Sequence, residues 1–186
     1  ILFGKFDIVT CGSKRLKMFV NSMNPKLQVK VSGDTRFDQV KLRADANHFK
    51  HFSDKFGRDK VVLGSIIPSD YKVVFNGIRE HWGDTSGIEV GEHIVAVPQE
   101  VAEFDLKQLE TELEKQGLTY KRRSDEIELG EQDVTIVDSV GVLAELYGYG
   151  KLAYVGAGFG AGVHSVIEPA VYNIPVSFGP NISLLD

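Results

Sequence analysis

The stretch KVVLGSI, residues 60–66, is a largely apolar run that predicts a strand buried on both faces of a sheet. Further candidate strands follow it along the chain: HIVAVP (93–98), TYKRR (119–123), VTIVD (134–138), LAYVG (152–156) and IPVSFG (174–179). The segments between them carry apolar residues at helical spacing, most clearly DLKQLETELEKQG (105–117). Strands that alternate with helices predict right-handed crossovers. We therefore expect an α/β fold, a Rossmann-like parallel sheet with helices on both faces.

Two further helices of this sheet are expected over residues 140–149 and near residues 165–173. Another follows KVVLGSI, where Ser69 and Asp70 are expected to cap a helix that runs to about Trp82. These helices complete the alternation of strand and helix on which the fold prediction rests.

The first 60 residues predict a smaller arrangement that precedes the main sheet. Strands are expected at FDIVT (6–10) and LQVKVSG (27–33), with a helix over residues 12–23 between them. A long helix is expected over residues 37–57, where phenylalanine and aliphatic side chains recur at helical spacing and Gly57 marks the end.

Composition and charge narrow the possible functions. The 186 residues are 42% hydrophobic, and no stretch approaches the run of about 18 apolar residues that a transmembrane helix needs. The net charge is −5, although residues 1–60 carry 13 basic and 6 acidic residues. Their basic cluster SKRLKMF (13–19) is able to face an anionic membrane surface, but a solvated helix face is the simpler explanation. Because basic and aromatic residues are not interleaved, we expect no nucleic-acid binding.

Ligands of open parallel sheets bind beyond the carboxyl ends of the strands. This rule places the candidate site at the loops 65–69, 98–101, 138–141 and 156–168. The last loop, GAGFGAGVHSVIE, has a GxGxxG-like spacing, but it comes late in the sheet and lacks an acidic partner about 20 residues further on. It is therefore not a dinucleotide fingerprint. Its glycines are nevertheless expected to let the backbone approach a ligand closely.

Glu168 and His164 are the candidate functional side chains of this loop. Pro169 places Glu168 near a helix start, because proline fits a first turn but not a helix interior. A carboxylate there is suited to accept two hydrogen bonds from a vicinal diol such as ribose; alternatively, it only complements the helix dipole. His164 is either a site residue, or a helix cap or packed imidazole.

The remaining histidines do not predict a metal site. His48 and His51 lie three residues apart on a predicted helix but lack a nearby third ligand, and His81 and His93 are isolated. We expect neither a metal nor another cofactor. Cys11 is the only cysteine, so an internal disulfide is excluded.

The segment DSVGVLAELYGYGKLAYVGAGFGAGVHSVIEPAVYNIPVSFGPN (138–181) resembles the donor-binding domain of the 3-deoxy-D-manno-octulosonic acid (Kdo) transferases, which add Kdo to lipid A precursors. VSGDTRFDQV (31–40) is similar to that family's linker. The resemblance implies the C-terminal half of a GT-B glycosyltransferase, in which two Rossmann-like domains face each other across a cleft. Residues 1–33 would be the end of the N-terminal domain and the interdomain joint. Residues 34–186 would be the nucleotide-sugar-binding domain, shortened at its C-terminus.

The resemblance also implies the donor, CMP-Kdo, and the residues that bind it. Glu168 would hold the ribose hydroxyls, and Arg36 would supply positive charge for the phosphate or the Kdo carboxylate. The full set that the motifs assign to the donor is Arg36, Ser65, Pro98, Gln99, Gly158, Gly160, His164 and Glu168. The family's catalytic base lies in the first domain. We therefore expect no catalytic residue in this chain and no activity from the chain alone.

The full-length parent would meet the lipid A precursor and the membrane surface on the cytoplasmic side of the bacterial inner membrane. Two motifs depart from the family. Ile66 and Ile67 follow Ser65 where threonine and then histidine or tryptophan are usual, and Gln99 follows Pro98 where a basic residue is usual. These departures leave open a non-catalytic nucleotide- or partner-binding module.

Another GT-B enzyme that uses a UDP-sugar, a transferase or an epimerase, is the second alternative. The retaining type often pairs two glutamates eight residues apart. Positions 160 and 176, eight residues on either side of Glu168, hold glycine and valine, which disfavours that type.

Overall fold

The computed structural model describes residues 5–46, 57, 59–82, 94–125 and 132–185. Internal contacts divide the chain into an N-terminal unit, residues 1–42, and a larger unit, residues 43–186. The division falls within helix α2 (Thr35–Asp45). The domain boundary expected after residue 33 stays a prediction. Each unit is described here by itself.

The N-terminal unit is a strand–helix–strand arrangement, as the sequence predicts. β1 (Ile8–Cys11) and β2 (Gln28–Val31) pair in parallel, and α1 (Lys14–Met23) connects them. The Ser13 hydroxyl accepts a hydrogen bond from the Leu16 N–H at 3.1 Å and so caps α1. The small core is formed by Val20, Leu27 and Val29.

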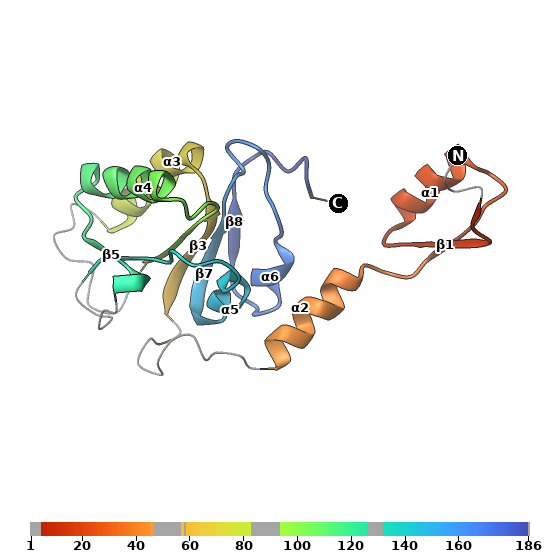
Figure 1. Ribbon diagram of the computed structural model, residues 1–186, viewed down its shortest axis with the longest axis horizontal. Coiled ribbons are helices and arrows are strands. Elements are labelled where there is room, and N and C mark those ends of the chain that lie inside the picture. Colours follow the sequence, from red (N-terminus) through yellow and green to blue (C-terminus); the bar gives the residue numbers. More distant parts are fainter. Residues whose placement is uncertain (1–4, 47–56, 58, 83–93, 126–131, 186) are drawn as a thin grey trace. The chain divides into compact units, whose positions relative to one another are not determined.

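The larger unit is built on a parallel sheet of six strands in the order β5-β6-β4-β3-β7-β8 (Figure 1). The strands are β3 (Lys60–Ile66), β4 (Ile94–Pro98), β5 (Tyr120–Arg122), β6 (Val134–Ile136), β7 (Gly150–Val155) and β8 (Val176–Phe178). Every pairing in this sheet is parallel. The central strands β3 and β4 are buried almost throughout, which explains why their sequences are apolar runs without alternation.

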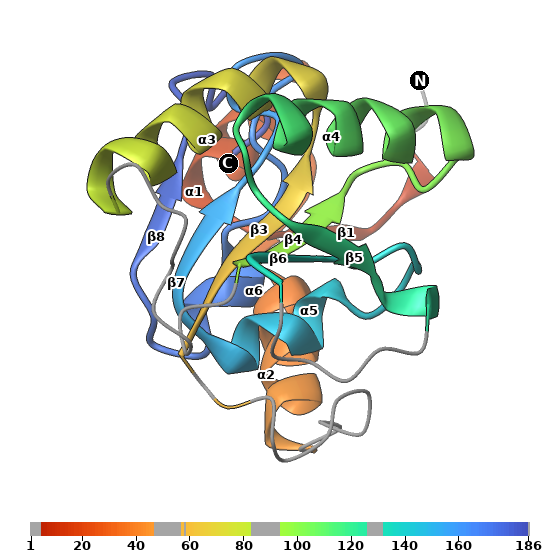
Figure 2. The ribbon, with the colours of Figure 1, turned by 90° about the vertical axis from the view of Figure 1, so that its left-hand side faces the viewer.

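Helices cover both faces of this sheet (Figure 2). One face packs against α3 (Pro68–Trp82) and α4 (Glu103–Lys115), and the other against α5 (Leu143–Leu146), the 3-10 turn η4 (Tyr147–Tyr149) and α6 (Ile167–Ala170). Successive residues of a strand point to opposite faces. Val61 and Leu63 accordingly belong to the core under α3 and α4, and Val62 to the core under η4. The Rossmann-like fold prediction is confirmed.

The helix boundaries differ from the sequence prediction at several places. The helix expected over residues 37–57 is α2, which ends at Asp45; residues 47–56, with His48 and His51, lie outside the described residues. The helix expected from residue 140 begins only at Leu143, because Gly141 has φ +84°, a left-handed conformation that an α-helix cannot contain. No helix in the described part of the chain is long and apolar enough to cross a membrane.

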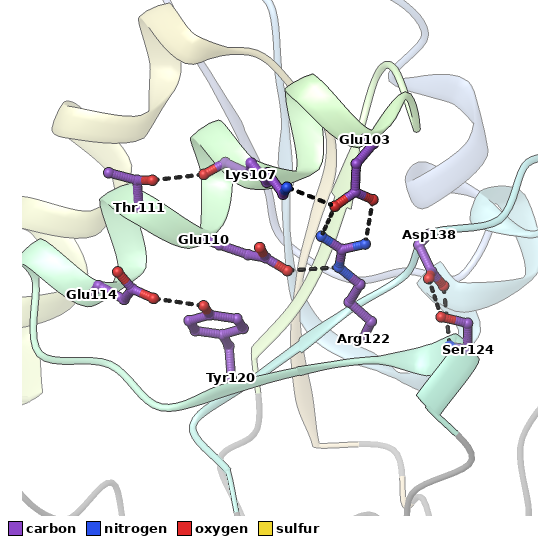
Figure 3. A network of polar contacts seen from close by, with 9 residues as sticks. All are labelled: Glu103, Lys107, Glu110, Thr111, Glu114, Tyr120, Arg122, Ser124 and Asp138. Carbon is purple, nitrogen blue, oxygen red and sulfur yellow. Dashed lines mark hydrogen bonds and ion pairs between the residues drawn. The ribbon is translucent and has the colours of Figure 1, made fainter.

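Ion pairs hold the short edge strand β5 to α4 (Figure 3). The Arg122 guanidinium donates to Glu103 at 2.6 and 3.0 Å and to Glu110 at 2.6 Å. The Tyr120 hydroxyl donates to Glu114 at 2.8 Å. The hydrogen bonds from Arg122 lower the pKa of Glu103. Nearby, the hydroxyl and the backbone N–H of Ser124 both donate to the carboxylate of Asp138, in the segment that follows β6.

Candidate functional site

The strand order of the sheet reverses beside β3. From β3 the chain passes to β4 on one side, and later places β7 on the other side. A reversal of this kind opens a crevice beyond the carboxyl ends of the strands, where α/β proteins bind ligands. The loops after β3 and β7 lie at this edge of the sheet, on either side of the reversal, and the loop after β4 is their neighbour. Three of the four loops expected from the sequence therefore lie together.

Asp70 is fully buried at the start of α3, in the loop region that follows β3. The helix begins at Pro68, so Asp70 is its third residue, and the Asp70 carboxylate accepts the N–H of Ile67 at 3.0 Å. This contact is one half of a capping box, with proline at the first helical position. The sequence predicted that Ser69 and Asp70 cap this helix, and Asp70 does cap it, although both residues lie within the first turn and Ile67 is the residue before the helix.

The same carboxylate binds the loop that follows β7, residues 156–163, which we call the glycine loop. Oδ2 of Asp70 accepts the Ala157 N–H at 2.7 Å, and Oδ1 accepts the Phe159 N–H at 3.4 Å. Oδ1 also accepts the Tyr154 hydroxyl at 3.0 Å. Burial of a carboxylate is costly unless its oxygens are hydrogen-bonded, and these donors satisfy them. Asp70 thus ties the loop after β3 to the glycine loop.

Asn181, in the loop after β8, also binds the glycine loop. Its backbone N–H donates to the Gly158 carbonyl at 2.9 Å, and its side-chain amide donates to the Gly160 carbonyl at 2.8 Å. The Asn181 carbonyl accepts the Val163 N–H at 2.9 Å. Asp70 therefore binds only N–H groups of the glycine loop, while Asn181 binds two of its carbonyl groups and one N–H group.

Close packing of backbone explains the first glycines of this loop. A Cβ on Gly156 would lie 2.3 Å from the Ser65 carbonyl oxygen, and a Cβ on Gly158 would lie 2.5 Å from the Gly179 nitrogen. The sequence indicated that these glycines let the loop approach a ligand. At Gly158 the requirement for glycine instead comes from contact with the loop after β8.

His164 and Gln99 are brought together from two different loops. His164 Nε2 lies 3.0 Å from Gln99 Oε1, and because the amide oxygen only accepts, the imidazole donates in this contact. The Gln99 N–H donates to the Ile66 carbonyl at 3.1 Å, which fixes the start of its loop against β3. The pair is exposed, so both side chains are accessible from the crevice side of the sheet.

Glu168 is the half-buried second residue of α6. Within the part of the chain that the structure describes, its carboxylate accepts no hydrogen bond. Burial raises the pKa of Glu168 above its ordinary value of 4.5, as expected when a charged group loses water without gaining donors. Glu168 therefore has acceptor capacity that the described residues do not use.

Tyr147 is a neighbour of Glu168 that sequence reasoning missed. Its ring is buried, and its hydroxyl packs on β3, where a Cβ on Gly64 would lie 2.0 Å from it. Burial, and then the charge of Glu168, raise the pKa of Tyr147. No local pattern marks this tyrosine, because its importance depends on contact with a strand more than 80 residues earlier.

The other residues predicted to bind the nucleotide sugar, Ser65, Pro98 and Arg36, each have different neighbours in the structure. Ser65 follows the regular part of β3 in a left-handed conformation, with φ +52°. Pro98 ends β4 and pairs with Ile66. Arg36 lies in the N-terminal unit and pairs with Asp34 at 2.6 Å, and its contact with a donor stays a prediction. The described residues contain no group of three side chains able to hold a metal ion.

The larger unit has the class of fold found in the C-terminal half of GT-B glycosyltransferases, with its polar loops at the switch point of the sheet. The chain is related to the 3-deoxy-D-manno-octulosonic acid transferases. It is 34% identical to the transferase of Chlamydophila psittaci over 66% of this chain, and 30% identical to that of Aquifex aeolicus over 64% of this chain. The resemblance seen in the sequence is confirmed.

The chain spans only 27% and 31% of the lengths of these two relatives. No family model matches it. Its fold is similar to that of a solved structure, the C-terminal CMP-Kdo binding domain of WaaA from Acinetobacter baumannii, with a TM-score of 0.55 and 20% identity. That similarity covers 77% of this chain and 72% of the other.

A Gly158→Ala variant tests the packing of the glycine loop. We expect it to lower the free energy of unfolding by about 1–3 kcal/mol, because the new Cβ overlaps the Gly179 backbone. The control is Gly77→Ala in α3, where a Cβ meets no atom within 4 Å and alanine should stabilise the helix by up to about 1 kcal/mol. Urea unfolding measures both. A Gly158→Ala variant as stable as the parent would contradict the packing argument.

A Glu168→Gln variant tests the burial of a carboxylate that accepts no hydrogen bond from the described residues and is only partly stabilised by the charge of Arg43. The raised pKa means that the folded state binds a proton more tightly than the unfolded state. Ionisation therefore costs folding stability as the pH rises above about 4.5, and this cost is absent below it. We expect Glu168→Gln to be more stable than the parent at pH 7, with a difference that shrinks towards pH 3–4. Urea unfolding across this range measures it.

The control for this experiment is Glu80→Gln on the exposed side of α3, which should show no such difference. A Glu168→Gln variant that is less stable than the parent at pH 7 would mean that Glu168 has a favourable partner in the folded chain.

Proposed function

We propose that the larger unit binds the nucleotide sugar CMP-Kdo, as the donor-binding half of a glycosyltransferase that transfers Kdo to a lipid A precursor. The observation that carries the proposal is the Glu168 carboxylate, half-buried at the start of α6 and without a hydrogen-bond donor among the described residues. The two hydroxyls of a ribose would donate to it and offset its desolvation. The relationship to the Kdo transferases supports CMP-Kdo as the nucleotide sugar.

The exposed pair of His164 and Gln99 supports a second contact with the donor. The imidazole and the amide present hydrogen-bonding groups beside the glycine loop, where a phosphate or sugar would lie if Glu168 holds the ribose. Ser65, Pro98, Gly158 and Gly160 would line the same crevice mainly through backbone. Arg36 would add positive charge from the N-terminal unit.

The three residues that depart from the family's motifs, Ile66, Ile67 and Gln99, differ in whether their side chains could contact a donor. Ile66 is 2% exposed and belongs to the core under α3, so its side chain is not available to a donor in any case. Ile67 faces the glycine loop, where its Cδ1 would lie 2.9 Å from a Cβ on Gly160. Only at Gln99 does the departure concern an exposed polar contact.

In the proposed scheme, the transfer reaction would also use groups from outside this chain. A base must deprotonate the acceptor hydroxyl, and the leaving CMP phosphate must be stabilised. We place the base, the acceptor site and the membrane contact in the preceding domain of the parent, on the cytoplasmic side of the bacterial inner membrane. No cofactor is required in this scheme, because the donor is already activated.

Nucleotide titrations test the donor assignment. We expect the chain to bind CMP in preference to UMP and ADP in isothermal titration calorimetry. Glu168→Gln should weaken CMP binding about tenfold or more, since a hydrogen bond to a charged group contributes about 1.5–3 kcal/mol. Glu80→Gln is the matched control and should bind like the parent.

A preference for UMP would instead support a UDP-sugar enzyme. Absence of any nucleotide binding by a folded chain would support a partner-binding module, and either result would overturn the CMP-Kdo proposal.

A transfer assay tests the division of labour between domains. We expect no transfer of labelled Kdo to a lipid A precursor by the chain alone, because positioning of both reactants between two domains contributes about 7–11 kcal/mol to such reactions. The same assay is repeated after addition of a separately expressed N-terminal domain, which we expect to restore only a trace of Kdo transfer. Clear turnover by the chain alone would place the catalytic base within its 186 residues.

A further inference from the structure

Asp70 is a polar group at the crevice that the proposed donor contacts do not use. It is fully buried, and both of its oxygens accept hydrogen bonds from the protein. A side chain in this position is closed to a ligand. We propose that Asp70 is a positioning residue for the donor, one that holds the glycine loop in the conformation that presents His164 and Glu168. This inference rests on the proposed function.

The first step of the argument is the conformation of Ala157. This residue is fully buried and has φ +66°, a left-handed conformation that is unfavourable for any residue other than glycine. Its N–H is directed at Asp70 Oδ2, at 2.7 Å, which is the shortest hydrogen bond from the glycine loop to this carboxylate. A strained backbone of this kind persists where its surroundings fix it. The Asp70 carboxylate supplies that restraint.

The second step is the turn that Ala157 starts. Its carbonyl accepts the N–H of Gly160 at 3.0 Å and the N–H of Gly162 at 2.9 Å. The two peptide groups that flank Ala157 therefore link the contact with Asp70 to the path of the chain up to Gly162. Val163 then binds the Asn181 carbonyl, and His164 follows directly.

The third step concerns the chemistry that this position requires. A carboxylate presents only acceptors, and the groups around Asp70 are all donors: two N–H groups of the glycine loop, the N–H of Ile67 and the hydroxyl of Tyr154. An asparagine has nearly the same shape but would turn an NH₂ group towards one pair of donors. Asp70→Asn should therefore release the glycine loop while the apolar core under α3 stays intact.

Three variants separate positioning from general stability. Asp70→Asn is expected to weaken CMP binding about tenfold or more and to speed amide exchange at Ala157 and Gly162 by a similar factor, as measured by calorimetry and NMR. Asp70→Glu keeps both acceptor oxygens and should restore most of the affinity. Tyr154→Phe removes one donor to Asp70 but none from the glycine loop, so it should leave loop exchange and CMP affinity near parental values.

The exchange measurement keeps this inference distinct from the donor assignment. If the parent does not bind CMP, the proposed function fails, and unchanged loop exchange in Asp70→Asn would separately overturn the role of Asp70. If Asp70→Asn does not fold, the test is made on the parent protein. There we expect the amide proton of Ala157 to be shifted downfield and protected from exchange, and an unprotected proton would overturn the inference. Equal losses of affinity in Asp70→Asn and Tyr154→Phe would also overturn it, because they would indicate general destabilisation.

Discussion

The Asp70 carboxylate accepts hydrogen bonds from donors in three segments: the turn before α3, the end of β7 and the glycine loop. These segments lie on β3 and β7, the two strands between which the sheet reverses its order. Crevices at such reversals are open by construction, because the flanking connections run to opposite sides. Because the Asp70 carboxylate is buried between β3 and β7, it holds the loops after these two strands at a fixed spacing and leaves the edge of the sheet open.

Asp70 and Glu168 show how one functional group takes two roles. Both are carboxylates near a helix start beside the glycine loop. Asp70 is completely buried and satisfied by N–H and hydroxyl donors, whereas Glu168 is half-buried and receives none from the described residues. The raised pKa of Glu168 reflects desolvation that the charge of Arg43 offsets only in part. Such a cost is retained where a ligand supplies the missing donors, and this contrast is the physical basis for the proposed ribose contact.

The sequence predicted the sheet well because a parallel sheet covered on both faces requires apolar strands, and those runs are visible without any contact information. The loops at the carboxyl edge follow from the same order, so the sequence could point to His164, Gln99 and Glu168, whose role in donor binding stays a prediction. Asp70 was assigned only as a cap, because its other partners lie 84 to 89 residues away. Gly158 was assigned to ligand approach for the same reason: nothing local shows that Gly179 packs against it.

Gln99, which stands where the family usually has a basic residue, makes an exposed contact with His164. The amide oxygen of Gln99 accepts the N–H of His164 at 3.0 Å and orients the ring, a contact that a basic side chain, which offers only donors, would not make. The loop after β4 therefore contributes an amide that orients the imidazole of the segment after β7. In the proposed donor complex, the negative charge of the donor would then be met by backbone N–H groups or by residues outside this loop, and Arg36, at the start of α2, stays the basic residue that the resemblance to the family suggests.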